Sequence, residues 1–591
     1  MFQKASPPIG IGLLLFLVVA SSAIISGLAW SQPTRGKAQP TVTITLIHMG
    51  DLHGHLVPRP NVRSDTTGKT AGGLARMYTR IEEIRRRSKH NLLLNTGDTI
   101  QGSAEVLFTR GQAIADVVDQ FKIDYFAPGN WDFVYGSQRF LELFGGNKAR
   151  WGAISANLYY DGEPFAEKSG ALVIAPYQVQ AIAGVKLGIL GLTARRGPQV
   201  SPGLAVTKGF KFTSGDDEVP RYVKELREKH AVDAVILLSE QGLANNVRMA
   251  EAYPGIDVIL SSDMHEVTRR PIVTSKGTVI VEEGQDGTRL GEVVLRFEGH
   301  KLAGWKWVGH DIDERIMDSA PIAAKVAEVR RSFISGSAFV KHKNPFNGLL
   351  LTRPIDTVVG ETAVALHRSN FSNEAMPAVI EGTSHDFLAD AFREVTGADV
   401  GAIRGFRYGT HVPPGPIRLE DLYHFIPIGP MIAKGTIKGK QLKNQIENSA
   451  EGTLSPAIQD WTGGWLFNYS GLIAKIDPSG SKGNKAPEVR VRRAGNVEFA
   501  DLDPEADYTY ASYYYAADPN HIGVVPAKEI QIYKDQDGTP LDGVEVVARY
   551  LSTLPGKRAD PGPARFTLVR PLPPPAFGFP EVQPLRGVEP N

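Results

Sequence analysis

The stretch TVTITLIHMGDLHGH, residues 41–55, joins an apolar strand to a pair of polar side chains. Residues 41–48 are rich in β-branched side chains, which predicts a buried strand. Asp51 and His53 follow directly. An Asp and a His two residues apart in an extended loop can point to the same side and bind one cation, because carboxylate and imidazole together suit Mn, Fe or Zn. The stretch therefore predicts a strand whose carboxyl end carries metal ligands.

Strands and helices alternate along the chain after this stretch. Further short apolar strands are expected at residues 91–95, 123–127, 153–156, 185–192, 234–239 and 258–261. Helices are expected between several of them, at residues 71–87, 112–121 and 219–229. Such alternation is typical of a layered α/β domain.

Acidic, His and Asn side chains recur at the carboxyl ends of these strands. Asp98 closes the segment NTGD, Asn130 lies in PGNWD, and Glu240 closes LLSE. Asp263 and His265 both lie in SSDMH. Open α/β sheets bind ligands at these ends, and a carboxylate such as that of Asp98 can bridge two cations. Each segment alone is more often a solvated turn, but their recurrence at successive strand ends predicts a two-metal centre.

The composition excludes several classes of function. The chain has 591 residues, and its 65 Lys and Arg balance its 64 Asp and Glu, so no global field attracts nucleic acid or an anionic membrane. We therefore expect no nucleic acid polymer as a partner. The chain contains no cysteine, which removes disulfides, thiolate ligands, a cysteine nucleophile and a lipoprotein anchor.

The amino-terminal segment indicates export. Lys4 precedes an apolar run at residues 9–29, and Ala29-Trp30-Ser31 offers small residues for cleavage. The run is also long enough to remain as an uncleaved membrane anchor, the only membrane contact expected. The expected location is periplasmic or extracellular.

The pattern changes after residue 309, where a helix at residues 321–333 leads into a loop rich in Lys, Asn and Pro. Further helices are expected at residues 383–396 and 439–449, with scattered strands, which favours an α+β domain. The expected divisions are a signal peptide or anchor (1–31), a first, α/β domain (41–310), a linker helix and loop (311–353), a second, α+β domain (354–570) and a Pro-rich tail (571–591).

Several of these segments resemble a known superfamily, the calcineurin-type metallophosphoesterases, and within it the 5'-nucleotidase branch. The similar segments of the first domain are IHMGDLHGH, GGLARM, NTGDTIQGS, APGNWDF and SSDMH. Those of the second domain are TSHDFLADA, GADV, AIR, FIPIG and GKQL, and the resemblance covers roughly residues 41–569. It implies a four-layer αββα catalytic domain with two divalent ions, and an α+β carboxyl-terminal domain that rotates to bring substrate to them.

The resemblance also implies a ligand set. One ion would be bound by Asp51, His53, Asp98 and His265, and the other by Asp98, Asn130, Glu240 and Asp263. The family usually has His at the positions of Glu240 and Asp263, so the second site here would offer only oxygen, which favours Mn, Mg or Ca over Zn. A weakened or lost second site is the alternative. Manganese is the expected ion, with Mg, Fe and Zn as alternatives.

A further departure concerns the reaction itself. Asn130 is followed by Trp131 and Asp132, whereas nucleotidases have after the Asn a His that assists phosphoryl transfer. The catalytic candidates are therefore Asn130, Trp131, Asp132 and, as the nearest spare imidazole, His55. His55 is equally well explained as an exposed loop residue.

Other segments are similar to the sulfur-oxidation thiosulfohydrolases (SoxB) of the same superfamily. They are GNWDFVYG, GDTIQGSAEVLFTRGQ, GFRYGT and WTGGWLFNYSGL. Those enzymes hydrolyse a sulfonate from a cysteine persulfide on a carrier protein. The chain is thus expected to hydrolyse either a small phosphomonoester such as a nucleotide or a carrier-bound sulfonate. A non-catalytic protein that binds nucleotides or metal is the remaining alternative.

The second domain supplies the candidates for substrate binding. Arg404 and Arg407 lie in a Gly-rich stretch and offer forked donors for an oxyanion, although ordinary surface arginines fit the pattern equally well. Phe467 and Tyr469 can form an aromatic floor for a base, although core packing explains such residues as often.

Overall fold

The computed structural model describes residues 40–60, 69–146, 150–195, 197, 206–368, 379–404, 411–457 and 460–575. The apolar run at residues 9–29 and Arg407 lie outside these ranges. Within them, no helix is both long and apolar enough to cross a membrane.

The first sheet has the strand order β15-β14-β1-β4-β5. Its members are β1 (Thr41–Met49), β4 (Asn91–Asn95), β5 (Tyr125–Phe126), β14 (Arg289–Glu298) and β15 (Lys301–Asp311). β1, β4 and β5 are parallel, and Met49 of β1 pairs with Asn95 of β4, which in turn pairs with Phe126 of β5. The carboxyl ends of β1, β4 and β5 are therefore level, and the loops that follow these strands start at the same edge of the sheet.

The second sheet has the order β12-β13-β11-β10-β8-β7. Its members are β7 (Tyr177–Ile182), β8 (Val185–Leu192), β10 (Ala234–Ser239), β11 (Val258–Ser261), β12 (Ile272–Val273) and β13 (Val279–Glu282). The parallel strands β10 and β11 are in register through Ser239 and Ser261. Their carboxyl ends are also level, so Glu240 and the loop with Asp263 leave the sheet together.

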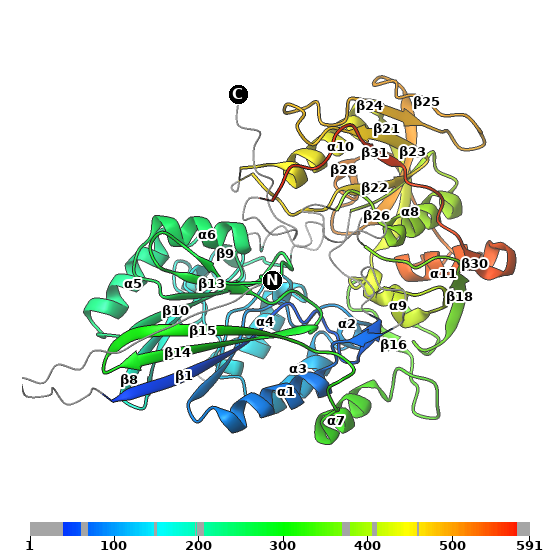
Figure 1. Ribbon diagram of the computed structural model, residues 1–591. Coiled ribbons are helices and arrows are strands. Elements are labelled where there is room, and N and C mark those ends of the chain that lie inside the picture. The colour runs from blue at the N-terminus through cyan, green and yellow to red at the C-terminus, as the bar shows by residue number, and fades with distance from the viewer. Residues whose placement is uncertain are drawn as a thin grey trace, which may run out of the picture. The chain divides into compact units, whose positions relative to one another are not determined.

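The described part of this domain forms four layers, helix, sheet, sheet and helix, as the family resemblance implies (Figure 1). Side chains such as Leu46 of β1 and Ile236 of β10 meet in the core between the two sheets. The outer face of the first sheet packs against α1 (Leu74–Arg87) and α3 (Gln112–Val118). The outer face of the second packs against α5 (Glu218–Glu228) and α6 (Leu243–Ala252).

Helix α1 shows why such a helix covers a sheet. Leu74, Met77, Ile81 and Ile84 recur at helical spacing and are 0–1% exposed. Burying each of these side chains stabilises the domain by roughly 1.5–3 kcal/mol relative to leaving it in water. The basic residues of the last turn, Arg85 to Arg87, complement the negative end of the helix dipole.

The second part of the chain is an α+β structure that follows helix α7 (Ala320–Arg330). Its main sheet, in the order β22-β19-β26-β21-β29, consists of β19 (Val400–Arg404), β21 (Met431–Lys438), β22 (Phe467–Ser470), β26 (Asp507–Tyr514) and β29 (Lys528–Ile532). Helix α8 (Thr383–Thr396) matches its prediction and ends at Gly397, whose φ of 61° is the left-handed cap that favours glycine. Helix α10 (Gly439–Leu454) extends further than expected.

One expected strand was wrong, and one pair of strands was not anticipated. Residues 153–156 were expected to form a strand, but Ala153 and Ile154 make only isolated bridges, to Phe126 and Ala175. The segment connects the two sheets and belongs to neither. The long antiparallel pair β14–β15 was not anticipated, because β15 is largely exposed and lacks a clear apolar face.

Candidate metal centre

The predicted metal ligands leave both sheets and meet. Asp51 and His53 follow β1, Asp98 follows β4 and Asn130 follows β5, all in the first sheet. Glu240 follows β10, whereas Asp263 and His265 follow β11, both in the second sheet. All seven residues are buried. The sheets therefore place these polar side chains together beneath the surface.

The loops hold these side chains in an uncommon backbone conformation. Positive φ values occur at Asp51 (47°), His53 (43°), Asp98 (47°), Asp263 (104°) and His265 (62°). Residues other than glycine rarely adopt this region, and their clustering is characteristic of functional sites. The fold thus strains the backbone at the residues that the sequence predicts as ligands.

Backbone hydrogen bonds between the loops maintain this arrangement. The N–H of Asp51 donates to the carbonyl of Gly97 at 3.0 Å, and the N–H of His53 donates to the carbonyl of Asp98 at 2.9 Å. Gly102 lies against the same loop, where a Cβ atom would sit 1.6 Å from the carbonyl oxygen of His53. The loops after β1 and β4 therefore form one rigid support.

Among the described residues, one candidate ligand group consists of Asp51, His53 and His265, and we call it the mixed site. The Nε2 atoms of His53 and His265 are 2.8 Å apart, and each lies 3.6 Å from Oδ1 of Asp51. Nδ1 of His53 lies 3.0 Å from Oε1 of Gln101. Because an amide oxygen only accepts, Nδ1 carries the proton and Nε2 keeps its lone pair for a cation.

The other group consists of Asp51, Asp98 and Glu240, and we call it the carboxylate site. Oδ2 of Asp98 lies 3.6 Å from Nε2 of His53, so Asp98 also borders the mixed site. Burial, followed by the nearby charge of Asp51, raises the pKa of Asp98 well above its usual value. Burial and the charge of Asp98 act in the same direction on the pKa of Glu240. Such a cluster is costly unless cations neutralise it.

The residues fit divalent cations. Oδ2 of Asp98, Oδ1 of Asn130 and both carboxylate oxygens of Glu240 are buried and have no hydrogen-bond partner within the described chain. Buried oxygens of this kind normally have partners. Metal coordination accounts for these four atoms together, and the donor set of carboxylate, amide and imidazole suits it.

Asn130 and Asp263 lie beside the two sites. The backbone N–H of Trp131, the residue after Asn130, donates to Oδ1 of Asp98 at 2.7 Å, and the Trp131 side chain is buried. The N–H of Asp263 donates to Oδ2 of Asp51 at 3.2 Å, but its carboxylate is in neither ligand group. The main chain at these positions therefore orients carboxylates of the centre.

Asp132 has a supporting position. Its carboxylate accepts hydrogen bonds from the backbone N–H groups of Thr99 (2.9 Å), Ile100 (3.0 Å) and Gly129 (2.8 Å). These bonds join the loop after β4 to the loop after β5. The structure therefore explains Asp132 by loop geometry rather than by contact with a substrate.

His55 is directed away from the ligand groups. It is 4% exposed, so it is not an exposed loop residue. Its Nε2 lies 3.3 Å from Oδ1 of Asp286, and its ring is 4.4 Å from that of His424 on α9 (Leu419–Phe425). Burial, followed by the charge of Arg59, lowers the pKa of His55 well below its usual value. This position does not suit a proton donor.

The substrate-binding candidates are placed differently from one another. Arg404 is exposed at the end of β19, whereas Arg407 lies outside the described residues. Tyr469 is 1% exposed in the core of the second domain, and its hydroxyl donates to Oε1 of Gln445 at 3.0 Å. Phe467 is half-buried and packs against the same core. For Tyr469 the aromatic floor is thus a wrong interpretation, because core packing occupies the ring.

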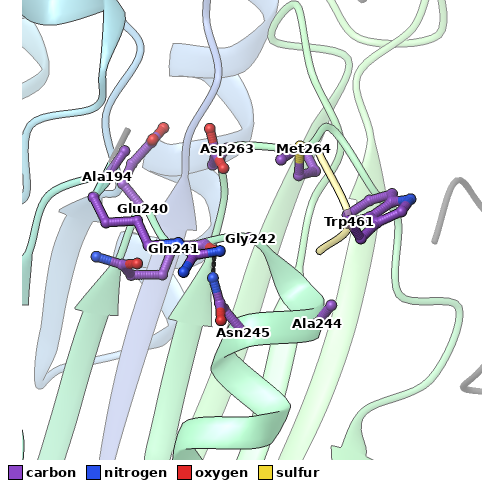
Figure 2. Close-up of a pocket in the computed structure, with 10 residues that line it drawn as sticks. Ala194, Glu240, Gln241, Gly242, Ala244, Asn245, Asp263, Met264 and Trp461 are labelled. Carbon is purple, nitrogen blue, oxygen red and sulfur yellow. Dashed lines mark hydrogen bonds between the residues drawn. The ribbon is translucent and has the colours of Figure 1, made fainter. Parts of the chain in front are cut away.

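A pocket beside the carboxylate site was not predicted from the sequence. Figure 2 shows Glu240 and Asp263 at one end of it and Met264 and Trp461 at the other. Its remaining lining residues are Ala194, Arg195, Gln241, Gly242, Ala244 and Asn245. Trp461 comes from a segment about 200 residues away in sequence, beyond the range of local patterns. The pocket therefore borders the carboxylate side of the centre through Glu240.

The fold and the site define the class of protein: its first domain is a layered α/β structure with a centre suited to divalent metal. The family comparisons agree with this class. The calcineurin-like phosphoesterase model matches residues 44–267, and the 5'-nucleotidase carboxyl-terminal domain model matches residues 358–522. The chain therefore has the two-domain architecture of a metal-dependent hydrolase, a calcineurin-like phosphoesterase domain followed by a 5'-nucleotidase carboxyl-terminal domain, and calcineurin-like phosphoesterases bind two divalent metals.

Individual relatives are distant. The chain is 26% identical to the snake venom 5'-nucleotidase of Crotalus adamanteus over 83% of this chain and 81% of that protein. It covers only 38% of another relative, the endonuclease YhcR of Bacillus subtilis. Two solved structures from Thermus thermophilus share the fold. The 5'-nucleotidase precursor has a TM-score of 0.71 at 22% identity, with 90% of this chain and 100% of that chain covered. The sulfate thiohydrolase SoxB has a TM-score of 0.72 at 20% identity, with 92% and 99% covered.

Proposed function

We propose that this protein is a two-metal hydrolase of phosphomonoesters such as nucleotides. The observation that carries the proposal is the pair of ligand groups that share Asp51. Two divalent ions held in this way supply an activated water nucleophile and neutralise charge that develops on the transferred group. The resemblance of the second domain to 5'-nucleotidases favours a nucleotide as the ester.

The chain's own residues have separable tasks in this proposal. Asp51, His53, Asp98, Glu240 and His265 hold the ions, and Asn130 adds an amide oxygen. Gln101 and the main chain of the loops orient these ligands. The forked guanidinium of Arg404 binds the oxyanion of the substrate.

A second candidate is hydrolysis of a carrier-bound sulfonate, and Trp131 favours it. Trp131 occupies the position after Asn130 where nucleotidases have a His, and the described structure has His55 directed elsewhere. The GNWDFVYG segment around Trp131 is similar to the thiosulfohydrolases, and SoxB shares the fold. A carrier protein would then be the partner.

Product analysis separates these candidates. The purified protein is loaded with Mn²⁺ and incubated with p-nitrophenyl phosphate, with 5'-nucleotides and with a peptide that carries a cysteine S-thiosulfonate. Phosphate release supports the leading proposal, and sulfate release supports the second. Asp98→Asn abolishes either activity, because Asp98 borders both sites, while the fold survives. Release of neither product by protein with bound metal would identify a binding protein and overturn both proposals.

We also propose that the protein is exported. The apolar run at residues 9–29, with Lys4 before it, supports this location. Cell fractionation tests export, and sequencing of the mature amino terminus tells a cleaved signal from a retained anchor. Recovery of the protein from the cytoplasm with an intact amino terminus would contradict export.

A further inference from the structure

The two ligand groups offer different atoms to a cation. The mixed site presents two imidazole nitrogens and one carboxylate, whereas the carboxylate site presents only oxygen, from Asp51, Asp98 and Glu240. Asn130, the amide predicted as a further ligand here, also offers an oxygen. Nitrogen and sulfur ligands suit Zn²⁺, whereas oxygen ligands suit Mg²⁺, Ca²⁺ and Mn²⁺.

Glu240 distinguishes the carboxylate site from an ordinary acidic cluster. Its side chain is fully buried, and neither of its carboxylate oxygens has a hydrogen-bond partner within the described chain. Most buried carboxylates elsewhere in the domain have such partners. Glu283, for example, accepts a hydrogen bond from Nε1 of Trp307 at 2.9 Å. Glu266, whose two oxygens also lack such partners, belongs to neither ligand group. At Glu240 the two oxygens without partners coincide with a ligand group shared with Asp51 and Asp98, and together these observations indicate a cation.

We propose that this centre binds two different divalent ions, with Zn²⁺ or Fe²⁺ at the mixed site and Mn²⁺ or Mg²⁺ at the carboxylate site. The inference deepens the two-metal hydrolase proposed above and rests on it for the location of the centre. We expect the preference for Zn²⁺ over Mn²⁺ to differ between the two sites. Zn²⁺ generally binds more tightly than Mn²⁺ at any site of nitrogen and oxygen ligands, so the sites differ in the ratio of the two affinities. This ratio is smaller at the carboxylate site than at the mixed site by at least about tenfold.

Competition between the two metals tests this inference without any substrate. Metal-free full-length protein is equilibrated with excess Mn²⁺ and limiting Zn²⁺, and bound ions are counted by elemental analysis. The expected product holds one Zn²⁺ and one Mn²⁺, and its electron paramagnetic resonance spectrum is that of an isolated Mn²⁺ ion. Protein that takes up Zn²⁺ in pairs, or that binds a single ion, would overturn the proposal.

Variants assign the effect to Glu240. Glu240→His gives the carboxylate site an imidazole. A second Zn²⁺ then displaces Mn²⁺ at a zinc concentration at least about tenfold lower than the wild type requires. Glu240→Gln keeps the size and one oxygen but removes the charge, and the second Mn²⁺ is lost while the mixed site remains filled. Glu283→Gln is the matched control, because Glu283 is also buried but belongs to neither group, and it behaves like the wild type.

The outcomes also separate this inference from the proposed function. Two unlike ions in a protein that releases no product uphold the metal inference and reject the hydrolase. Hydrolysis by a protein with two equivalent Zn²⁺ ions upholds the hydrolase and rejects the inference. A Glu240→His variant that binds metals as the wild type does would show that Glu240 is not a ligand and would overturn the inference.

Discussion

Nε2 of His53 and Nε2 of His265 face each other at 2.8 Å, although the two residues follow strands of different sheets and are 212 positions apart in sequence. The rings are tilted by 52° with centroids 4.7 Å apart, so they meet through their Nε2 atoms rather than by stacking. The mixed site therefore exists only when the two sheets are packed together, and it reports on that packing.

We expect His265→Ala to weaken binding of the first ion by at least about tenfold, because it removes one of two imidazole ligands. Isothermal titration with Mn²⁺ measures the change. His300→Ala serves as the control, since the His300 side chain is 80% exposed and far from the ligand groups in sequence. Equal affinities in both variants would exclude His265 from the centre.

Gln101 is expected to be a positioning residue. Gln101→Leu removes the acceptor that fixes the tautomer of His53, so metal affinity falls by about 10- to 100-fold. Gln101→Glu restores an acceptor and with it the affinity, which a purely steric role would not do. Gln178→Leu on the exposed side of β7 should have no effect. The idea fails if the Leu variant binds Mn²⁺ like the wild type.

Arg404→Ala and Arg407→Ala are each expected to lower kcat/KM. The corresponding loss of transition-state stabilisation is about 2 kcal/mol for each variant, the cost of a lost charged hydrogen bond to an oxyanion. Steady-state kinetics with the substrate found in the product analysis gives the value. Arg558→Ala is a suitable control, because Arg558 is exposed in the same domain. Unchanged kinetics would assign Arg404 and Arg407 to the ordinary surface.

The stability of the first domain should depend on pH through Glu292. Burial by itself would raise the pKa of Glu292. Hydrogen bonds from His310 (2.8 Å) and Arg87 (2.5 and 2.6 Å) outweigh this effect and lower the pKa from 4.5 to about 2. A lowered pKa in the folded state stabilises the fold above pH 4.5, and this stabilisation is lost as the pH falls towards 2.

Glu292→Gln should therefore lower the free energy of unfolding by about 1 kcal/mol at neutral pH, since Arg87 is half-exposed and solvent screens its charge. The difference from the wild type should shrink as the pH falls below 4.5. Urea unfolding at several pH values measures it, with Glu298→Gln as the exposed control. A difference that grows towards acid pH would show the opposite linkage.

The local pattern of the sequence was sufficient to predict the layered fold and to single out candidate ligands. The expected strands at residues 91–95, 185–192, 234–239 and 258–261 coincide with β4, β8, β10 and β11. Buried parallel strands are short, continuous apolar runs, and polar residues directly after them are conspicuous. Because parallel strands of one sheet are level at their carboxyl ends, Asp51 and Asp98 could be predicted to lie together, as could Glu240 and His265.

The tertiary structure alone decided which of these side chains meet. The sequence could not show that Asp51 belongs to both ligand groups, or that Gln101 orients His53, because such contacts depend on how two sheets pack. It also did not predict that His55 lies against Asp286 or that Tyr469 lies in the core. Side-chain direction in a loop depends on φ and ψ values that no local pattern encodes, and the positive φ values at five predicted ligands are maintained by hydrogen bonds between distant loops.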